Sequence, residues 1–306
     1  MHARHHRSAA AVLAAGLTLT VTAACGQQDA GSVAATTPAA TTSSAPPPQP
    51  QPTTGPAVGF ETAGFSDPTR VDNRWFPLVV GTKMVYRGQT IEDGEVMAHG
   101  VEFTVTDLTK TVAGVEAVVV LELDFSAGDL EEAELAMFAQ ADDGTVWHLG
   151  QYPEVYEDGR VVEHPAWVHG VKEAQAGITI RADDQPGAGS YSQGWGPEVG
   201  WSDRARVIET GQRVCVVAGC FDDVKVTEES SDEEPGAFQH KYYGPGVGNV
   251  KVGWAGDDPT RETLELVSVE KLDAGELASA RGAALKLEKS GFTRSPDVWG
   301  TTGPAG

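Results

Sequence analysis

Apolar and polar residues alternate along most of the chain after residue 76. In the segment VEFTVTDL (101–108) every second residue is apolar, and VEAVVVLELDF (115–125) repeats the pattern with Glu116, Glu122 and Asp124 mostly opposite the apolar positions. A period of two predicts β-strands, because successive side chains of a strand point to opposite faces. We therefore expect one face of these strands to be buried, with the acidic side chains on the other face.

Turn sequences that contain glycine separate these segments. Asp142-Asp143-Gly144 divides MFAQADDGTVWHLG (137–150) into a predicted hairpin, and Glu92-Asp93-Gly94 and Glu157-Asp158-Gly159 mark further turns. Roughly a dozen short strands with no helical pattern between them predict an antiparallel sheet rather than a βαβ fold. So many strands must curl, split or close to protect their edges. The expected fold class is all-β, with a single strongly curved antiparallel sheet or half-open barrel.

One segment near the C-terminus departs from the strand pattern. Within residues 274–290, Leu277, Ala280, Ala284 and Leu287 fall on one stripe, which predicts a short helix. Gly291 is predicted to end this helix. The residues after Gly291 are expected to form a loose tail.

The N-terminal residues are typical of a secretory signal. A basic start with Arg4 and Arg7 precedes an uncharged, mostly apolar stretch (9–24) that is too short to span a membrane. Residues 30–57 carry no charge and are rich in proline, threonine and serine, so they cannot bury enough apolar surface to fold. The predicted organisation is a signal peptide (1–24), a linker (25–57), an antiparallel β domain (58–273) and a C-terminal helix with its tail (274–306).

The end of the apolar stretch, Thr22-Ala23-Ala24-Cys25, resembles the lipobox of bacterial lipoproteins. This resemblance implies cleavage before Cys25 and a diacylglycerol on its thiol, although Thr22 stands where the motif usually has leucine. Acyl chains would then hold the mature protein on the extracytoplasmic face of the cell membrane, because each buried methylene contributes about 0.8 kcal/mol. The alternative is an ordinary secreted protein that is cleaved at Ala-x-Ala or after Ala24.

The charge of the chain limits its partners. Loss of two arginines with the signal peptide takes the net charge from −22 to −24. Such an acidic protein is repelled by nucleic-acid phosphates and has no polybasic segment to hold anionic lipid. We therefore expect a membrane partner through the acyl anchor alone and no nucleic acid. The sequence predicts no cofactor and identifies no protein partner.

Cys215 and Cys220 lie close together in VCVVAGC (214–220). If Cys25 is acylated, they are the remaining two of three cysteines, an even pair in an oxidising compartment. A two-residue turn at Val217-Ala218 would place them opposite each other across a hairpin, within reach of a disulfide. A redox-active pair would need a shorter spacing at the start of a helix. We predict a structural disulfide.

Four segments resemble motifs of a group of actinobacterial-type secreted proteins and lipoproteins. They are VDNRWFPLVVGTKMVYRG (71–88), FAQADDGTVWHLG (138–150), GCFDDVKVTEE (219–229) and HKYYGPGVGNVKV (240–252). The resemblance spans residues 71 to about 268 and implies a curved antiparallel β domain, with no assigned activity and no catalytic residue. Threonine or a similar residue is usual in the group where this chain has Cys215 and Cys220. The segment YYGPGVGNV (242–250) also resembles the closing strand of lipoprotein-carrier folds, which hold acyl chains.

Searches for catalytic motifs are negative. The chain has no nucleophile elbow, phosphate-binding loop, His-Glu-x-x-His helix or dinucleotide fingerprint. His164 and His169 in HPAWVHG (164–170) are the strongest metal candidates, but a zinc site needs three or four ligands and no third is evident nearby. Surface or hydrogen-bonded histidines are the competing interpretation.

The aromatic residues are the other candidates for a site. Several tryptophans fall in or beside predicted strands, where packing in the core or at an edge is the simplest interpretation. The functional interpretation is an aromatic groove at the mouth of the curved sheet, which stacks a sugar or holds an acyl chain. The candidate ligand-binding residues are those in the segments that carry the resemblance: Trp75, Phe76, Trp147, Tyr242 and Tyr243.

These patterns favour a lipid-anchored, non-enzymatic ligand-binding or structural module of the cell envelope, with a lipid or glycan as the expected ligand. The alternative is an envelope hydrolase or metalloenzyme whose site is assembled from scattered residues. Three inward-pointing histidine or acidic side chains in a polar pocket would favour the enzyme. A wide apolar cleft would favour ligand carriage.

Overall fold

The computed structural model describes residues 55–57 and 59–306 of the chain. The predicted signal peptide, the lipidation site Cys25 and most of the predicted linker lie outside the described residues. Within the described part, no helix is both long enough and apolar enough to cross a membrane.

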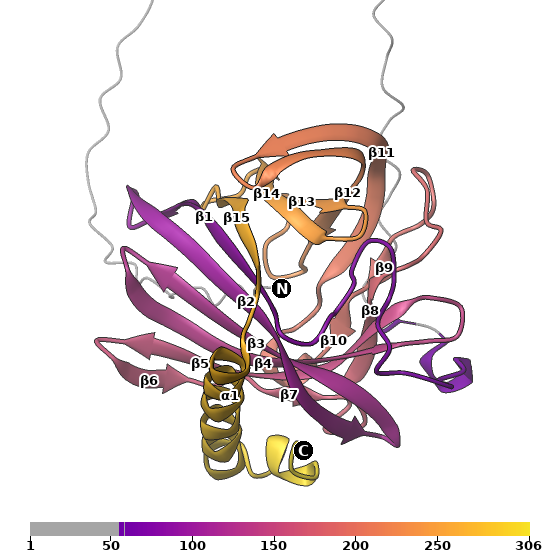
Figure 1. Ribbon diagram of the computed structural model, residues 1–306, viewed down its shortest axis with the longest axis vertical. Coiled ribbons are helices and arrows are strands. Elements are labelled where there is room, and N and C mark those ends of the chain that lie inside the picture. The colour runs from indigo at the N-terminus through magenta and orange to yellow at the C-terminus, as the bar shows by residue number, and fades with distance from the viewer. Residues whose placement is uncertain (1–54, 58) are drawn as a thin grey trace, which may run out of the picture. The chain divides into compact units, whose positions relative to one another are not determined.

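Fifteen strands form one antiparallel sheet, as the sequence predicts (Figure 1). Their order across the sheet is β10-β8-β5-β4-β3-β2-β1-β15-β14-β13-β12-β11-β9, with β6 and β7 paired to β5. The strands are β1 (Thr82–Glu92), β2 (Glu95–Val112), β3 (Val115–Ser126), β4 (Asp129–Gln140), β5 (Val146–Glu157), β6 (Arg160–Glu163), β7 (Trp167–Val168), β8 (Gln175–Ile180), β9 (Tyr191–Ser192), β10 (Gly194–Trp195), β11 (Arg204–Val216), β12 (Gly219–Ser230), β13 (Ala237–Gly244), β14 (Gly248–Gly256) and β15 (Thr263–Lys271).

The sheet is built from two meanders, one from β1 to β8 and the other from β11 to β15. They join where β1 pairs with β15, so that Thr82 lies opposite Lys271. At the far ends of the strand order stand β10 and β9, which are separated in the chain by Gln193 alone. The sheet therefore curves until its two edges approach each other, without closing into a barrel, and the predicted fold class is confirmed.

One face of the strands β2 to β5, here called the outer face, packs against the helix α1 (Ala274–Arg294) and the C-terminal residues. The helix begins with a capping box, in which Asp273 accepts from the backbone of Glu276 and the Glu276 carboxylate accepts from the Asp273 N–H. Its predicted stripe is confirmed, since Ala284 and Leu287 are buried in the outer-face core. Short 3₁₀ helices lie at Phe60–Thr62 (η1), Pro197–Val199 (η2) and Trp299–Thr301 (η3).

The predicted end of the helix and the predicted loose tail are wrong. The helix continues through Gly291 to Arg294, and Trp299 of η3 is fully buried against it. A Cβ at position 291 would lie 2.6 Å from Trp299 Cδ1, so this glycine permits a close approach rather than a stop. The last residue is also held, because the backbone groups of Gly306 and Thr109 exchange two hydrogen bonds of 3.0 Å.

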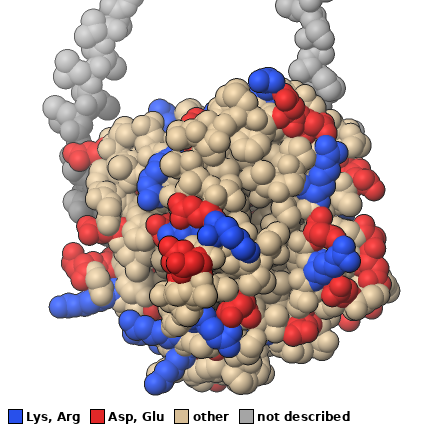
Figure 2. Space-filling view, in the orientation of Figure 1, with Lys and Arg blue, Asp and Glu red and all other residues tan. Residues whose placement is uncertain are grey.

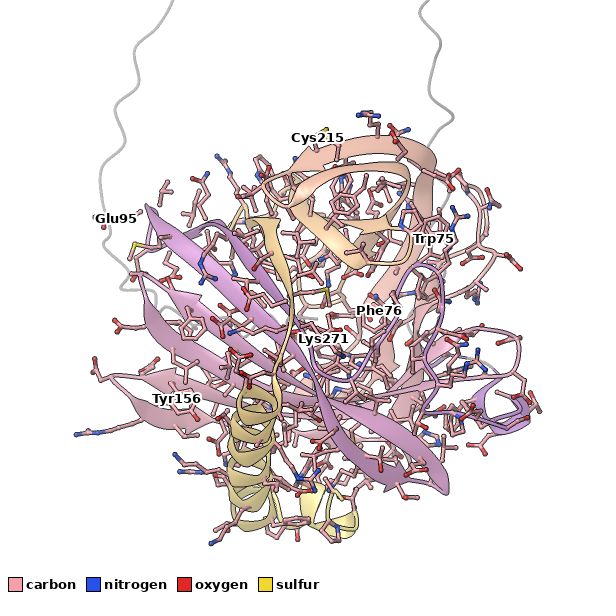
Figure 3. The ribbon with its side chains drawn as sticks, viewed as in Figure 1. Trp75, Phe76, Glu95, Tyr156, Cys215 and Lys271 are labelled. Carbon is pink, nitrogen blue, oxygen red and sulfur yellow. A yellow bond between two sulfur atoms is a disulfide. The ribbon has the colours of Figure 1, made fainter. Side chains whose placement is uncertain are left out.

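The hairpin of β11 and β12 has the predicted register. Cys215 lies directly opposite Cys220, and the two sulfur atoms form the expected disulfide at the tip of the hairpin (Figure 3). Its turn at Val217-Ala218 is the two-residue turn that the sequence indicates.

Candidate functional site

The face of β2 to β4 that points away from α1, here called the inner face, carries buried acidic side chains among its apolar ones. On β3, Leu121 belongs to the outer-face core, so the alternating Glu122 points inward, and on β4 Glu134 does the same. Glu122 is 5% exposed and Glu134 1% exposed. Alternation within each strand was predicted correctly, but the register places the apolar positions 101, 103 and 105 on the same face as the acids of β3, and this face is buried as well.

Most of the polar side chains on the inner face carry a charge. We call nine of them the inner charged cluster: Glu122 and Asp124 of β3, Glu132 and Glu134 of β4, Glu229 of β12, Glu262 before β15, His99 of β2, Lys225 of β12 and Lys241 of β13. Carboxylates outnumber cationic side chains in this cluster by six to three. By contrast, acidic and basic side chains are interspersed on the surface seen in Figure 2.

The strand register places like charges directly opposite each other. Glu122 pairs with Glu134, and Asp124 pairs with Glu132. Opposed carboxylates at such positions repel, and burial further disfavours their charged forms. Burial, followed by the charge of Glu122, raises the pKa of Glu134 to about 8, while Lys241 acts in the opposite direction. Burial and the charge of Glu134 likewise raise the pKa of Glu132. Glu132 and Glu134 are therefore expected to hold protons at neutral pH.

His99 bridges two acids of the cluster. Its Nδ1 lies 3.4 Å from Asp124 and its Nε2 lies 3.4 Å from Glu262. Burial alone would lower the pKa of His99, but the bond to Glu262 and the charges of both acids raise it to about 9. The ring is therefore an imidazolium cation at neutral pH. Gln239 donates a further hydrogen bond of 2.7 Å to Glu262.

Lys241 neutralises a second acid. Its Nζ lies 2.7 Å from Glu229, and Gln193 Nε2 donates to the other oxygen of this carboxylate at 2.8 Å. Burial would lower the pKa of Lys241, but Glu229 raises it above the ordinary value. Gln193 is the residue that links β9 to β10, so this group ties the junction of the sheet edges to the cluster.

Among the buried side chains of the inner face, those of Glu134 and Gln151 have no hydrogen-bond partner in the described part of the chain. Neither oxygen of Glu134 and neither amide atom of Gln151 is paired, although Gln151 is 0% exposed. Gln151 lies opposite Ala136 across β4–β5, and Ala136 is two residues from Glu134 on the same face. The two side chains are therefore diagonal neighbours. A buried, unpaired polar group costs about 1–3 kcal/mol, so both mark a place where a ligand could bind.

The segment before β1 brings Trp75 and Phe76 to the inner face of the sheet (Figure 3). The ring of Phe76 contacts Phe138 and Phe103, with centroids 5.3 and 6.0 Å apart. Lys225 Nζ lies 4.7 Å from the centre of the Trp75 ring and donates to the Arg181 carbonyl at 3.3 Å. Burial lowers the pKa of Lys225 to about 8.

The other three candidate aromatic residues do not form one groove with this pair. Tyr243 lies opposite Lys225 and is buried, so it shares the inner face with Trp75 and Phe76. Tyr242 points to the other face, where Lys251 lies 5.8 Å from its ring. Trp147 belongs to the outer-face core and contacts Phe60 with ring centroids 5.2 Å apart.

The predicted metal candidates His164 and His169 lie in different environments. His164 Nδ1 is 3.1 Å from the Ser295 hydroxyl, whereas His169 Nδ1 accepts from the Ala176 N–H at 3.0 Å. No group of three His, Cys, Asp or Glu side chains in the described part of the chain is arranged to hold a metal ion. His164 does line a pocket of about 230 Å³ between the C-terminal end of α1 and η2, together with Lys172 and Arg294.

Sequence reasoning missed the inner charged cluster. A signal was present, because LELDF (121–125) and EEAEL (131–135) both carry acids at alternate positions on either side of one turn. Pairing these two strands in a hairpin places their acids opposite each other. Only the burial of that face depends on contacts from the other half of the sheet.

No family model and no curated protein matches the chain. Two solved structures resemble it. One is described as an exported protein with a YmcC-like fold from Bacteroides fragilis, with 14% identity and a TM-score of 0.39 over 65% of this chain and 100% of that chain. The other is described as a lipoprotein from Parabacteroides distasonis, with 12% identity and a TM-score of 0.36 over 65% of this chain and 99% of that chain. Both likenesses are too distant to assign a ligand, an activity or an address to this chain.

Proposed function

We propose that this protein is a non-enzymatic module of the cell envelope, anchored through Cys25, that binds a small polar ligand on the inner face of its curved sheet. The observation that carries the proposal is the diagonal pair of Glu134 and Gln151, which are fully buried and have no hydrogen-bond partner among the described residues. A ligand with hydrogen-bonding groups would supply what these side chains lack.

The chemistry of the inner face favours a polar ligand over an acyl chain. An acyl chain on this face would lie against buried carboxylates and an unpaired amide and would leave them unsatisfied. The aromatic rings of Phe76, Phe103 and Phe138 provide apolar contact beside these groups. Of the lipid and glycan ligands expected from the sequence, the polar class fits this face better.

Native mass spectrometry of the protein purified from its own membrane tests the proposal. We expect a small polar molecule that is retained in a ratio of one to one. Gln151→Leu should reduce the occupancy of the retained molecule, because the variant removes both unpaired amide atoms while its side-chain volume stays close to that of glutamine. Gln89→Leu on the exposed side of β1 is the matched control and should retain the ligand. Equal occupancy in both variants, or no retained molecule in the unaltered protein, would remove the basis of the proposal.

The proposed location at the membrane has its own test. Cys25→Ala should move the protein from the membrane fraction to the medium or leave its signal peptide uncleaved, because no acyl chains would then hold it. A Cys25→Ala variant that still fractionates as a mature membrane protein contradicts the acyl anchor. Binding to the inner face is measured separately and does not depend on this result.

A hydrolase is the second candidate, and the raised pKa of Glu134 beside Glu122 favours it. A buried carboxyl group with a raised pKa beside a second carboxyl group can act as a general acid at neutral pH. The two candidates differ in what happens to the retained molecule. A binding module returns it unchanged after hours of incubation, whereas a hydrolase converts it to fragments that mass spectrometry detects.

A further inference from the structure

We infer that the ligand of the inner face is an organic cation, a small amine or guanidinium compound, and that the Glu134 carboxylate receives its positive charge. This inference rests on the proposed function, since it names the chemical class of the ligand that the inner face would bind. It assigns to Glu134 the role of ligand-binding residue and to Gln151 that of its neighbour in the same site.

The geometry of Glu134 is the first argument. An ionised carboxylate only accepts hydrogen bonds, and it has about four acceptor positions. Both oxygens of Glu134 lack a donor among the described residues, in a side chain that is 1% exposed. Ammonium and guanidinium groups consist of donors alone, and bonds between such groups and a carboxylate are shorter and roughly twice as strong as neutral ones. Gln151, which can both donate and accept, can bind a second polar group of the same ligand.

The balance of charge is the second argument. The three cationic side chains of the inner charged cluster are already engaged: His99 with Asp124 and Glu262, Lys241 with Glu229, and Lys225 with the Arg181 carbonyl and the Trp75 ring. None of these contacts reaches Glu134, and neither of its oxygens has a hydrogen-bond donor among the described residues, so its negative charge is not neutralised there when it ionises. A cation next to Glu134 would relieve its repulsion with the opposed Glu122. A neutral sugar would leave that repulsion unchanged.

The surroundings favour an organic cation over a metal ion. Calcium takes six to eight oxygen ligands and magnesium demands an octahedral set, at fixed short distances. The described residues contain no group of three His, Cys, Asp or Glu side chains with such an arrangement. Aromatic residues border the acids instead, since Phe103 lies opposite Glu122 and the charge of Glu122 acts on Tyr86. Aromatic faces attract ammonium and guanidinium groups that lie over them.

Binding of a cation should displace a proton. The titratable groups that face Glu134 are Glu122 from β3, Lys241 from β13 and the neighbouring Glu132 on its own strand, whereas β5 faces it with Gln151 and Pro153. Since the pKa of Glu134 is raised by burial and by Glu122, its carboxyl group is mostly protonated at neutral pH. A cationic ligand binds the ionised form, so its affinity should increase as the pH rises.

Isothermal titration of the full-length protein in detergent micelles tests the inference. The probes are putrescine, which carries two ammonium groups, agmatine, which carries an ammonium and a guanidinium group, and 1,4-butanediol as the uncharged counterpart of putrescine. We expect one of the two cations to bind with a stoichiometry of one and butanediol not to bind. Affinity at pH 6.5 should be about 25-fold lower than at pH 8.5, because a proton must first leave Glu134, whose pKa is about 8. Glu134→Gln should lower the affinity for the cation by about tenfold or more and abolish this pH dependence of the affinity.

Glu95→Gln is the matched control, because it removes the same charge from an exposed site at the tip of the β1–β2 hairpin (Figure 3). Unfolding midpoints of both variants show that each remains folded at the temperature of the titration. Equal weakening in both variants would show a general effect of net charge and overturn the assignment to Glu134. Displacement of the cation by calcium chloride at equal concentration would indicate a metal site and overturn the organic-cation class.

Failure of the inference and failure of the proposed function give different results. One outcome is that neither cation binds while native mass spectrometry finds a retained neutral molecule that Gln151→Leu removes. In that case the cationic class of the ligand is wrong, but the proposed binding function is supported. If butanediol binds as tightly as putrescine, the positive charge is not what is recognised. If no probe binds and no molecule is retained, the proposed function fails together with the inference.

Discussion

Each face of the sheet buries a glutamate, but only the glutamate of the outer face has a described partner. On the outer face, Lys110 Nζ lies 2.6 Å from Glu288 Oε1 and donates to the Gly303 carbonyl at 2.6 Å. The same Glu288 oxygen accepts the Ala305 N–H at 2.8 Å, and the Trp299 ring lies 4.7 Å from the ammonium nitrogen. On the inner face, Glu134 is buried as deeply without a described partner.

This difference separates a structural site from the proposed binding site. The Lys110–Glu288 pair is complete within the chain and fixes the C-terminal residues to the sheet, so nothing else is needed there. Glu134 and Gln151 lack hydrogen-bond partners among the described residues, and burial and the charge of Glu122 raise the pKa of Glu134. The same residue type therefore stabilises the fold on one face and is the basis of the proposed ligand binding on the other.

The largest expected effect comes from breaking the outer-face pair. Glu288→Ala should lower the free energy of unfolding by about 3–5 kcal/mol, because it leaves the Lys110 ammonium buried and uncompensated. Urea denaturation followed by tryptophan fluorescence measures the change. The double variant Lys110→Met with Glu288→Leu should be less destabilised than Glu288→Ala. A loss below about 1 kcal/mol in Glu288→Ala would show that the pair is not buried as described.

The corresponding change on the inner face, Glu134→Gln, should not lower the free energy of unfolding at pH 7.5. The pKa of Glu134 is about 8 in the folded protein and 4.5 as its ordinary value, so unfolding releases a proton between these pH values. Stability from this group is present below the ordinary value and is lost as the pH rises to about 8, with a slope of up to about 1.4 kcal/mol per pH unit.

Glu134→Gln should therefore flatten the fall in stability between the two pH values and should not destabilise the protein at pH 7.5. Urea denaturation across this pH range measures the slope, with Glu95→Gln as the control that keeps it. A steeper fall in Glu134→Gln would mean that Glu134 is charged and paired in the folded state.

The contact between α1 and η3 gives a smaller effect. Gly291→Ala should cost about 1–3 kcal/mol, because its Cβ would collide with the buried Trp299 ring. Gly282→Ala in the same helix is the control. No atom lies within 4 Å of its added Cβ, so it should stabilise the helix by about 0.5–1 kcal/mol. Thermal unfolding followed by circular dichroism compares the two, and equal shifts would show that Trp299 does not pack on Gly291.

An effect of similar size to that of Gly291→Ala is expected at the disulfide, which lies away from both glutamates. Replacing Cys215 and Cys220 together by alanine should lower stability by about 2 kcal/mol, since the bond closes only a short loop. The pH dependence attributed to Glu134 should not change. Mass spectrometry of the unfolded protein under alkylation checks the premise, because two thiols that react without prior reduction would exclude the bond.

Features set by short-range sequence were predictable. Alternation defined the strands, and the turn at Asp93-Gly94 adopts positive φ at both residues, as a tight two-residue hairpin requires. The Cys215–Cys220 register follows from a turn of two residues for the same reason. The apolar stripe of α1 was predictable for the same reason, because it depends only on residue spacing within the helix.

Features set by distant contacts were not predictable in this way. Gly291 matched a helix stop because nothing in its neighbourhood indicated that Trp299 would pack over it. Trp147 and Tyr243 were grouped by resemblance, but the register sends them to opposite faces. Burial of Glu134 depends on the pairing of β1 with β15 and on the curl that this pairing completes. The binding candidate therefore became visible only with the whole sheet.

The pairing of β1 with β15 also has a consequence for how the chain reaches this structure. All other long strands pair with sequence neighbours, so their hairpins can form quickly from local contacts. The pairing of β1 cannot be completed until β15, the last strand to be synthesised, is available. Until then, β1 exposes an edge with unpaired backbone groups, which can recruit other extended chains. The interval between the emergence of these two strands is when the nascent protein is most exposed to aggregation.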